Sequence, residues 1–304
     1  MLIVNPASGK GRARKAIPRV LELAAGLGLE LAVHETSGPG SASEAARTAP
    51  EGVDRLLVIG GDGTVNEVVN GLGERVAAGG GALPVALIPT GTSNSAAREL
   101  GVPFDLDGAV AIAAGGDMRQ IDLGVANGRR FFLCAGTGPG AYIVTELHRR
   151  RTGAITTFRY YRHGVRCFLF YGFPLAKVTV DGRPAGEPAR MVVVTNMSHY
   201  GHPLKLVPDA KLDDGLLDVC IIRLRSRWSC LGVLWAMWRH RLEQRTDVEV
   251  LRVKTVRIEP ADPSRPLPLQ VDGDPGGELP VEISVLERAQ GFFVSPAPDS
   301  GPAP

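Results

Sequence analysis

The fold is decided by the stretch Leu56-Leu57-Val58-Ile59-Gly60-Gly61-Asp62-Gly63-Thr64-Val65-Asn66-Glu67-Val68-Val69-Asn70. Its four leading apolar residues are typical of a short strand buried on both faces. A glycine-rich loop follows, and apolar residues then recur at helical spacing. Glycines let backbone N–H groups approach an anion, and a helix N-terminus adds positive partial charge. The stretch therefore predicts either a nucleotide phosphate loop, with Asp62 directed at a metal, water or hydroxyl, or a tight strand-to-helix turn with a solvated Asp.

Composition limits the classes of protein that fit. The 304 residues are 44% hydrophobic and 22% charged, as in ordinary globular proteins, and the formal charge of +2 gives no reason to expect a nucleic-acid partner. No apolar run reaches the roughly 20 residues of a membrane span, and residues 2–4 resemble a strand rather than a signal peptide. The four cysteines lack metal-ligand spacing, which indicates reduced thiols. We expect a cytoplasmic protein without a transmembrane anchor.

Strand-like and helix-like segments alternate through the first half of the chain. Apolar runs at residues 2–4, 29–34, 56–59 and 85–88 are each followed by turn residues and a helical pattern. This alternation predicts a parallel α/β sheet, in which ligands bind beyond the carboxyl ends of the strands. The loops at residues 5–9, 36–40, 60–64 and 89–95 all fall at that edge. Residues 92–95 could instead serve as a helix N-cap.

The pattern changes near residue 121. Strand-like runs dominate from there on, at spacings that suggest a mostly antiparallel sheet structure. We expect an α/β domain over residues 1–121, a β-rich, sandwich-like domain over 122–294 and a disordered proline-rich tail over 295–304.

Several motifs in order resemble the catalytic fold of the diacylglycerol kinase and sphingosine kinase family, particularly its soluble bacterial lipid kinases. The matching pieces are Asn5-Pro6-x-Ser8-Gly9, Gly60-Gly61-Asp62-Gly63-Thr64-x-Asn66-Glu67, Pro89-x-Gly91-Thr92-x-Asn94-x-x-Ala97-Arg98, Ile121-Asp122-Leu123-Gly124, Asn196 with Tyr200-Gly201, Pro208-x-Ala210-x-x-Asp213-Asp214-Gly215-x-Leu217-Asp218 and Val271-Asp272-Gly273-Asp274. NAD kinases share the Gly-Gly-Asp-Gly-Thr core alone, whereas the full series is far more specific.

The resemblance implies transfer of the γ-phosphoryl group of ATP to a lipid hydroxyl, in a cleft between an N-terminal nucleotide domain and a C-terminal β-rich domain. The residues that it implies for ATP binding are Asn5, Pro6, Ala7, Ser8, Gly9, Thr36, Gly60, Gly61, Asp62, Gly63, Thr64, Val65, Asn66 and Thr92. The implied partner is a lipid substrate at a membrane surface. Diacylglycerol, phosphatidylglycerol and a sphingoid base all remain open as that substrate.

The resemblance also implies metal and catalytic residues. A structural metal site maps onto Asp214, with the backbone carbonyls of Lys211 and Leu216, and the proton acceptor maps onto Asp274. Phosphoryl transfer requires a cation over the phosphates and a group that orients the hydroxyl. We expect Asp62 and Asp122 to hold catalytic Mg²⁺, and Asp272 or Asp274 to orient the acceptor hydroxyl.

Two residues depart from the family pattern and keep other functions open. Ser95 stands where the family usually carries Asp, and Asp274 stands where it usually carries Glu. They motivate a second hypothesis, a nucleotide- or lipid-binding protein that has lost catalysis. A third hypothesis is an NAD kinase-like enzyme, against which the motifs at residues 89–98 and 271–274 argue.

Two segments, 158–171 and 228–241, combine aromatic residues with arginines, and the second contains all three tryptophans. Such segments suit a bilayer interface or an acyl-chain channel, which would place the protein peripherally at the membrane. Alternatively, they are two helices that cover the core of the β-rich domain. A homodimer could form through an edge strand of that domain.

Overall fold

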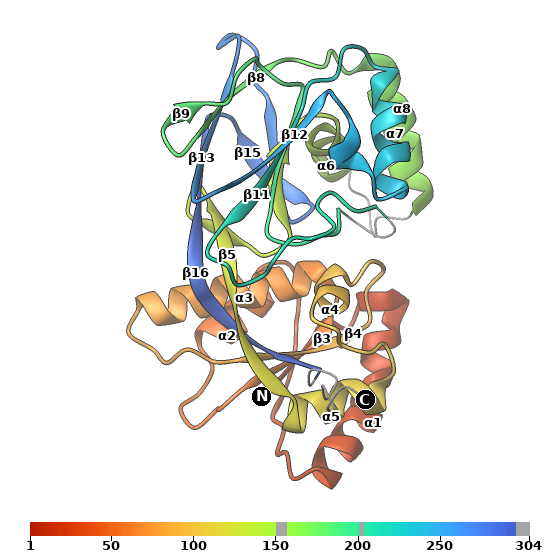
Figure 1. Cartoon of the computed structure of the whole chain (residues 1–304). Helices are drawn as coiled ribbons and strands as arrows, with labels where there is room; N and C mark the ends of the chain where they lie inside the picture. The colour runs from red at the N-terminus through yellow and green to blue at the C-terminus, as the bar shows by residue number, and fades with distance from the viewer. Residues whose placement is uncertain (150–156, 201–203, 296–304) are drawn as a thin grey trace, which may run out of the picture. The chain divides into compact units, whose positions relative to one another are not determined.

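The structure is a computed structural model, and it describes residues 1–149, 157–200 and 204–295, with residues 157–161 as backbone only (Figure 1). The chain divides into two compact units, unit 1 of Met1–Ile121 with Arg288–Pro304 and unit 2 of Asp122–Glu287. Two strands contribute residues to both units, β5 (Asp117–Ala126) and β16 (Val281–Val294). The domain limits expected from the sequence stay a prediction, and nearly all of the expected tail, residues 296–304, lies outside the described residues.

Unit 1 is built on a parallel sheet with the strand order β2-β1-β3-β4-β16. Its strands are β1 (Leu2–Val4), β2 (Val33–Glu35), β3 (Leu56–Gly60), β4 (Val85–Pro89) and the end of β16. The expected strands β1 and β3 are buried throughout. The strand expected over residues 29–34 is shorter and lies later, because the three residues of β2 form an exposed edge strand and so carry no apolar pattern.

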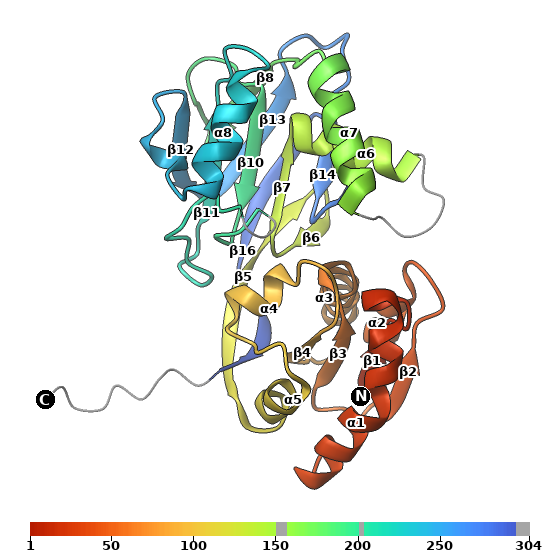
Figure 2. The ribbon, with the colours of Figure 1, turned by 90° about the vertical axis from the view of Figure 1, so that its right-hand side faces the viewer.

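Helices cover both faces of this sheet. They are the 3₁₀-helix η1 (Ser8–Gly11), α1 (Arg12–Gly26), α2 (Ser41–Arg47), α3 (Asp62–Ala77), α4 (Ser95–Glu99) and α5 (Leu106–Gly115). The chain moves from β1 outward to β2, and then back past β1 to β3 and β4. Right-handed crossovers therefore place α1 on one face and α2 and α3 on the other. Figure 1 shows α1 and α5 on one side of the sheet and α2 and α3 on the other, and Figure 2 views unit 1 from the side of α1 and α5.

Unit 2 contains two sheets. One is antiparallel with the order β12-β11-β10-β7-β14-β15, and the other continues from β16 through β13 and β8 to β9, with a β5–β6 hairpin beside it. The strands are β6 (Arg129–Phe131), β7 (Cys134–Thr137), β8 (Ala176–Val180), β9 (Arg183–Pro184), β10 (Met191–Thr195), β11 (Leu217–Ile222), β12 (Val248–Val253), β13 (Thr255–Pro260), β14 (Pro268–Val271) and β15 (Asp274–Glu278).

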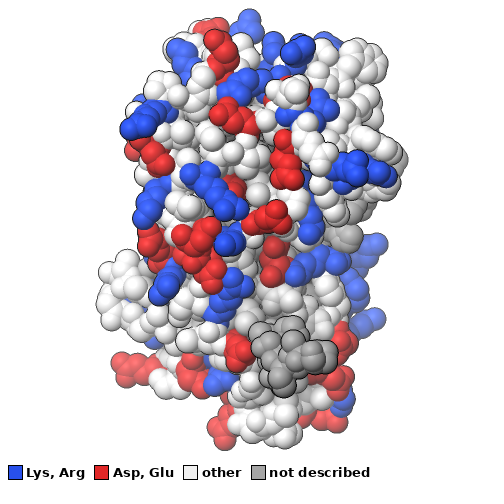
Figure 3. All heavy atoms as spheres, in the orientation of Figure 1, with Lys and Arg blue, Asp and Glu red and all other residues white. Residues whose placement is uncertain are grey.

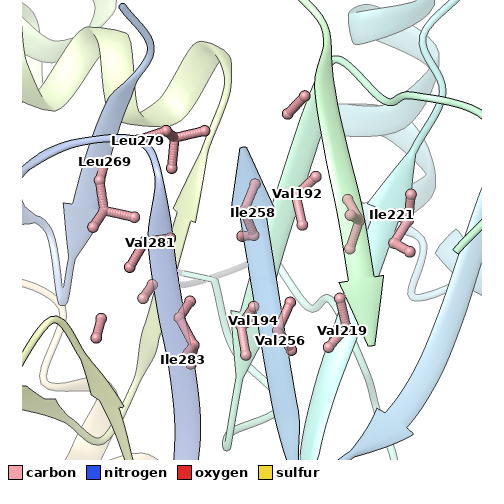
Figure 4. Close-up of a cluster of buried hydrophobic side chains, with 14 of the residues drawn as sticks. Val192, Val194, Val219, Ile221, Val256, Ile258, Leu269, Leu279, Val281 and Ile283 are labelled. Atoms are coloured by element: carbon pink, nitrogen blue, oxygen red, sulfur yellow. The ribbon is translucent and has the colours of Figure 1, made fainter. Parts of the chain in front are cut away.

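The core of unit 2 fills the space between these sheets. Figure 4 shows Val192, Val219 and Ile221 of one sheet pointing toward Ile258 and Ile283 of the other. A second apolar layer lies on the outer face of the antiparallel sheet, beneath α6 (Pro139–Arg149), α7 (Thr157–Phe170), α8 (Ser229–Trp238) and the 3₁₀-helix η2 (Leu242–Gln244). The expected combination of a parallel-sheet α/β domain with a mostly antiparallel, sandwich-like domain is confirmed.

Candidate active site

Three loops of unit 1 meet at the carboxyl edge of its sheet. The strand order reverses between β1 and β3, and this is where ligands bind in open parallel sheets. Asn5, after β1, donates from Nδ2 to Thr64 Oγ1 at 3.0 Å, which joins the first loop to the second. Thr90, after β4, donates from Oγ1 to Ser8 Oγ at 3.0 Å. The structure therefore brings together loops that the sequence placed at one edge.

The predicted ATP-binding residues follow the ends of these strands. Asn5, Pro6, Ala7, Ser8 and Gly9 come after β1, Gly60 and Gly61 lie at the end of β3, Asp62, Gly63 and Thr64 open α3, and Thr92 lies between β4 and α4. Thr36 comes after β2, where its backbone N–H donates to Val4 O at 2.8 Å. Val65 and Asn66 are buried in α3, and Val65 also lines a small pocket at this edge, so their contact with ATP stays a prediction.

The glycines of these loops have two different physical roles. A Cβ on Gly9, whose φ is +60°, would overlap Thr90 O, and one on Gly91 would lie 2.6 Å from the Cα of Gly61. These glycines let the loops approach one another backbone to backbone. Gly63 differs, because a Cβ there would meet nothing within 4 Å. Its missing side chain leaves the exposed first turn of α3 open to an anion.

Asp62 is half-buried and faces the start of α4. Its Oδ1 accepts a hydrogen bond from Ala96 N at 3.1 Å. Burial raises the pKa of the Asp62 carboxyl above its ordinary value, while the backbone N–H groups of residues 94–96 and the charge of Arg98 act in the opposite direction. This carboxylate therefore positions a neighbouring loop, whatever ligand it also binds. Ser95, where the family usually carries Asp, is buried, with its Oγ 3.0 Å from Ser93 Oγ.

Asn94 belongs to the loop that the sequence placed at this edge, but it was not among the residues expected to bind ATP. It lines a small pocket together with Gly61, Asp62 and the ends of β3 and β4. Its Nδ2 donates to Gly91 O at 3.0 Å, whereas its buried Oδ1 has no hydrogen-bond partner among the described residues. An unpaired buried acceptor is costly, so this oxygen is a candidate ligand contact. Its only sequence signal was its position in the motif at residues 89–98.

In unit 2, the predicted metal loop folds over Asp122. This residue is fully buried, its Oδ2 accepts from Gly215 N at 2.6 Å, and its N–H donates to Leu212 O at 2.7 Å. Asn196 Nδ2 donates to Asp122 O at 2.7 Å, while its buried Oδ1 has no partner among the described residues. The expectation that Asp122 holds catalytic Mg²⁺ stays a prediction, and in the structure its Oδ2 accepts a hydrogen bond from the predicted metal loop.

The residues of this loop can offer a cation only oxygen ligands. Asp214 would supply a carboxylate, while Lys211 and Leu216 would supply backbone carbonyls. Oxygen sets of this kind suit Mg²⁺ or Ca²⁺, so the chemistry of the donors fits. One Asp214 oxygen, Oδ1, also accepts from Leu216 N at 3.1 Å. Across residues 1–149, 157–200 and 204–295, no group of three or more His, Cys, Asp or Glu side chains could hold a metal.

The two carboxylates of the β14–β15 turn have different environments. Asp272 is buried, adopts a φ of +49° and accepts three backbone N–H bonds, from Phe132 at 3.1 Å, Leu133 at 3.0 Å and Cys134 at 2.9 Å. Such a carboxylate fastens the turn to residues 132–134, and it is not free to take a proton from a substrate.

Asp274 is half-exposed and lies between the side chains of Arg129 and His148. Arg129 of β6 approaches Oδ2 at 3.2 Å, and His148 Nε2 of α6 approaches Oδ1 at 3.2 Å. The other ring nitrogen, Nδ1, lies 3.0 Å from Val144 O. Both ring nitrogens of His148 thus lie within hydrogen-bond distance of an oxygen atom. Sequence reasoning missed Arg129 and His148, which no motif marks.

No helix within the described part of the chain is long and apolar enough to cross a membrane.

Comparisons with known proteins agree with this architecture. Residues 1–126 match the family model described as "Diacylglycerol kinase catalytic domain", and residues 136–292 match "YegS C-terminal NAD kinase beta sandwich-like domain". A solved structure of a diacylglycerol kinase from Bacillus anthracis str. Sterne superimposes with a TM-score of 0.73 at 24% identity, over 97% of this chain and 96% of that one. At that identity the likeness shows the fold alone.

Sequence relatives extend the agreement over nearly the whole chain. A diacylglycerol kinase of Bacillus subtilis (strain 168) is 31% identical over 289 residues, which cover 94% of this chain and 93% of the relative. One from Staphylococcus aureus (strain MRSA252) is 32% identical over 94% of this chain and 89% of its own. This chain belongs to the diacylglycerol kinase family and is a kinase.

Proposed function

We propose that this protein transfers the γ-phosphoryl group of ATP to the hydroxyl of a lipid, with diacylglycerol as the first candidate acceptor. The observation that carries the proposal is the group of three loops joined by Asn5, Ser8, Thr64 and Thr90 at the strand-order reversal. A glycine-rich edge with an open helix start suits the phosphates of a nucleotide. The lipid class rests on relatives named diacylglycerol kinase at 31% and 32% identity.

The catalytic roles divide between the carboxylates. Mg²⁺, held by Asp62, would neutralise charge that develops on the phosphates. The lipid oxygen attacks the γ-phosphorus, its proton passes to the Asp274 carboxylate, and ADP leaves. Arg129 and His148 hold that carboxylate in place. We assign Asp272 and Asp122 to support, because backbone N–H groups already occupy their oxygens.

Incubation of the pure protein with γ-labelled ATP and Mg²⁺ tests the proposal. Separate reactions contain diacylglycerol, phosphatidylglycerol or sphingosine in mixed micelles, and a further one contains NAD. We expect label in a lipid product, none after chelation of the metal, and about 10²–10⁴-fold slower labelling with Asp274→Asn. Label in NADP would favour the NAD kinase-like alternative. Binding of ATP without transfer to any acceptor would favour a nucleotide-binding protein that has lost catalysis.

A further inference from the structure

Arg12, the first residue of α1, joins two loops at the carboxyl edge of unit 1. Its Nε donates to Gly9 O at 3.2 Å, and its Nη2 donates to Thr90 O at 3.2 Å and to Gly91 O at 3.5 Å. These carbonyls belong to the segments that follow β1 and β4. The three bonds hold the guanidinium in one place, so binding of a ligand to it loses little side-chain entropy.

The positive charge of Arg12 is not neutralised by an acid. Arg19, on the same helix, pairs with Asp107 at 2.7 Å, whereas Arg12 forms no ion pair with a residue that the structure describes. Its Nη1 carries two N–H donors, and neither of them bonds to a described residue. Arg12 is also exposed. It therefore offers a solvent-accessible cation with two unused donors.

Neighbouring features favour an anion at this place. A Cβ on Gly91 would lie 2.6 Å from the Cα of Gly61, so the residue whose carbonyl Arg12 contacts is packed against the loop that precedes α3. The first turn of α3 is open at Gly63, where backbone N–H groups attract negative charge. One oxygen of the Asp62 carboxylate is already bonded to the backbone of α4. On the face that Figure 3 draws, blue and red spheres are interspersed over unit 1, so an anion is attracted by particular side chains and not by a broad basic surface.

We infer that Arg12 binds the phosphates of the nucleotide through Nη1, while its other N–H groups keep the two loops together. A planar guanidinium presents paired donors that match phosphate oxygens. A nucleoside triphosphate carries more negative charge than one Mg²⁺ neutralises, so a cation held at this edge strengthens binding. This role rests on the proposed use of ATP, and it adds a residue outside the motif at residues 5–9.

Calorimetry with ATP and with adenosine, each with Mg²⁺ and without lipid, measures this contact. Arg12→Gln should weaken ATP binding about 10–100-fold, the contribution of one charge-assisted hydrogen bond, and should leave adenosine binding unchanged. Added salt should weaken ATP binding less in this variant than in the wild type, because one of the charges that salt screens is gone. Arg12→Lys keeps the charge without the planar fork, so it should lose less affinity than Arg12→Gln.

Arg19→Gln is the matched control, since it removes an arginine and an exposed ion pair from the same helix and should bind ATP as the wild type does. Circular dichroism checks that each variant is folded. ATP binding by Arg12→Gln that is as tight as in the wild type overturns the inference. A loss of the same factor for ATP and adenosine, with the salt dependence of the wild type, also overturns it, because Arg12 would then only join the loops. A wild type that binds ATP through Arg12 but labels no lipid would instead contradict the proposed function alone.

Discussion

Replacing Asp272 and Asp274 one at a time by Asn should separate stability from catalysis within three residues of chain. In Asp272→Asn, one oxygen still accepts from Leu133 and Cys134, but an amide N–H₂ now faces Phe132 N. Loss of one charge-assisted bond, with a buried donor left unpaired, costs about 2–4 kcal/mol of unfolding free energy. In Asp274→Asn the lost ion pairs are half-exposed and contribute only about 0–1 kcal/mol, whereas removal of the proton acceptor should lower kcat by about 10²–10⁴-fold.

Urea unfolding, followed by circular dichroism and by tryptophan emission, measures the first quantity. The tryptophans lie in the same unit as both carboxylates, so their signal reports on the unit that is perturbed. Transfer to lipid at saturating ATP measures the second. The reasoning is refuted if Asp274→Asn retains wild-type kcat, or if Asp272→Asn is as stable as the wild type. His148→Gln serves as a further comparison, because it removes one contact of the Asp274 carboxylate and leaves the carboxylate itself in place.

Three further predictions concern other parts of the chain. Asp62→Asn should abolish transfer. Its stability relative to the wild type should increase as pH rises from about 4, because burial raises the pKa of the Asp62 carboxyl and the wild type therefore loses stability when that carboxyl ionises. Equal urea midpoints of variant and wild type at every pH would contradict this. Gly9→Ala should lower the free energy of unfolding by about 1–2 kcal/mol or more, since it places a side chain at positive φ against Thr90 O. Gly63→Ala should raise the free energy of unfolding by up to about 1 kcal/mol, because alanine favours a helix over glycine, and it should weaken ATP binding. Denaturation measures the stability changes, and calorimetry measures ATP binding. Burial raises the thiol pKa to about 12 for Cys134 and Cys167 and to about 11 for Cys230, and raises that of Cys220 as well, so Ellman's reagent at pH 8 should label the native protein far more slowly than the unfolded one; rapid labelling of any native thiol would be evidence against this burial.

The sequence predicted which loops meet at the carboxyl edge of the parallel sheet because its signals there are local. Four apolar runs followed by turn residues identify strands and their carboxyl ends, and the parallel topology then places residues 5–9, 60–64 and 89–95 together without knowledge of any contact. The edge strand β2 was placed less well, because exposed residues leave no apolar pattern.

Side-chain partners from distant segments could not be predicted in the same way. Asp272 and Asp274 look alike in the sequence, and only the backbone N–H groups of residues 132–134 distinguish the supporting carboxylate from the accessible one. His148 acquires its position from a helix that packs beside β15. Asp62 was interpreted as a metal organiser, and its bond to Ala96 N depends on how the α4 loop turns back toward it. These contacts arise from tertiary packing, which periodicity and motif spacing do not encode.

The strand β16 has a consequence for the order in which the two units can finish folding during synthesis. Unit 1 opens the chain, yet one of its strands lies at residues 288–294, where Phe292 is fully buried beside Val85 and Gln290 donates to Leu83 O. On the ribosome, the first unit to emerge must therefore wait for the last strand, while unit 2 is continuous in the chain and can finish before it. The nascent chain thus keeps the edge of β4 unpaired until residues 288–294 have been made.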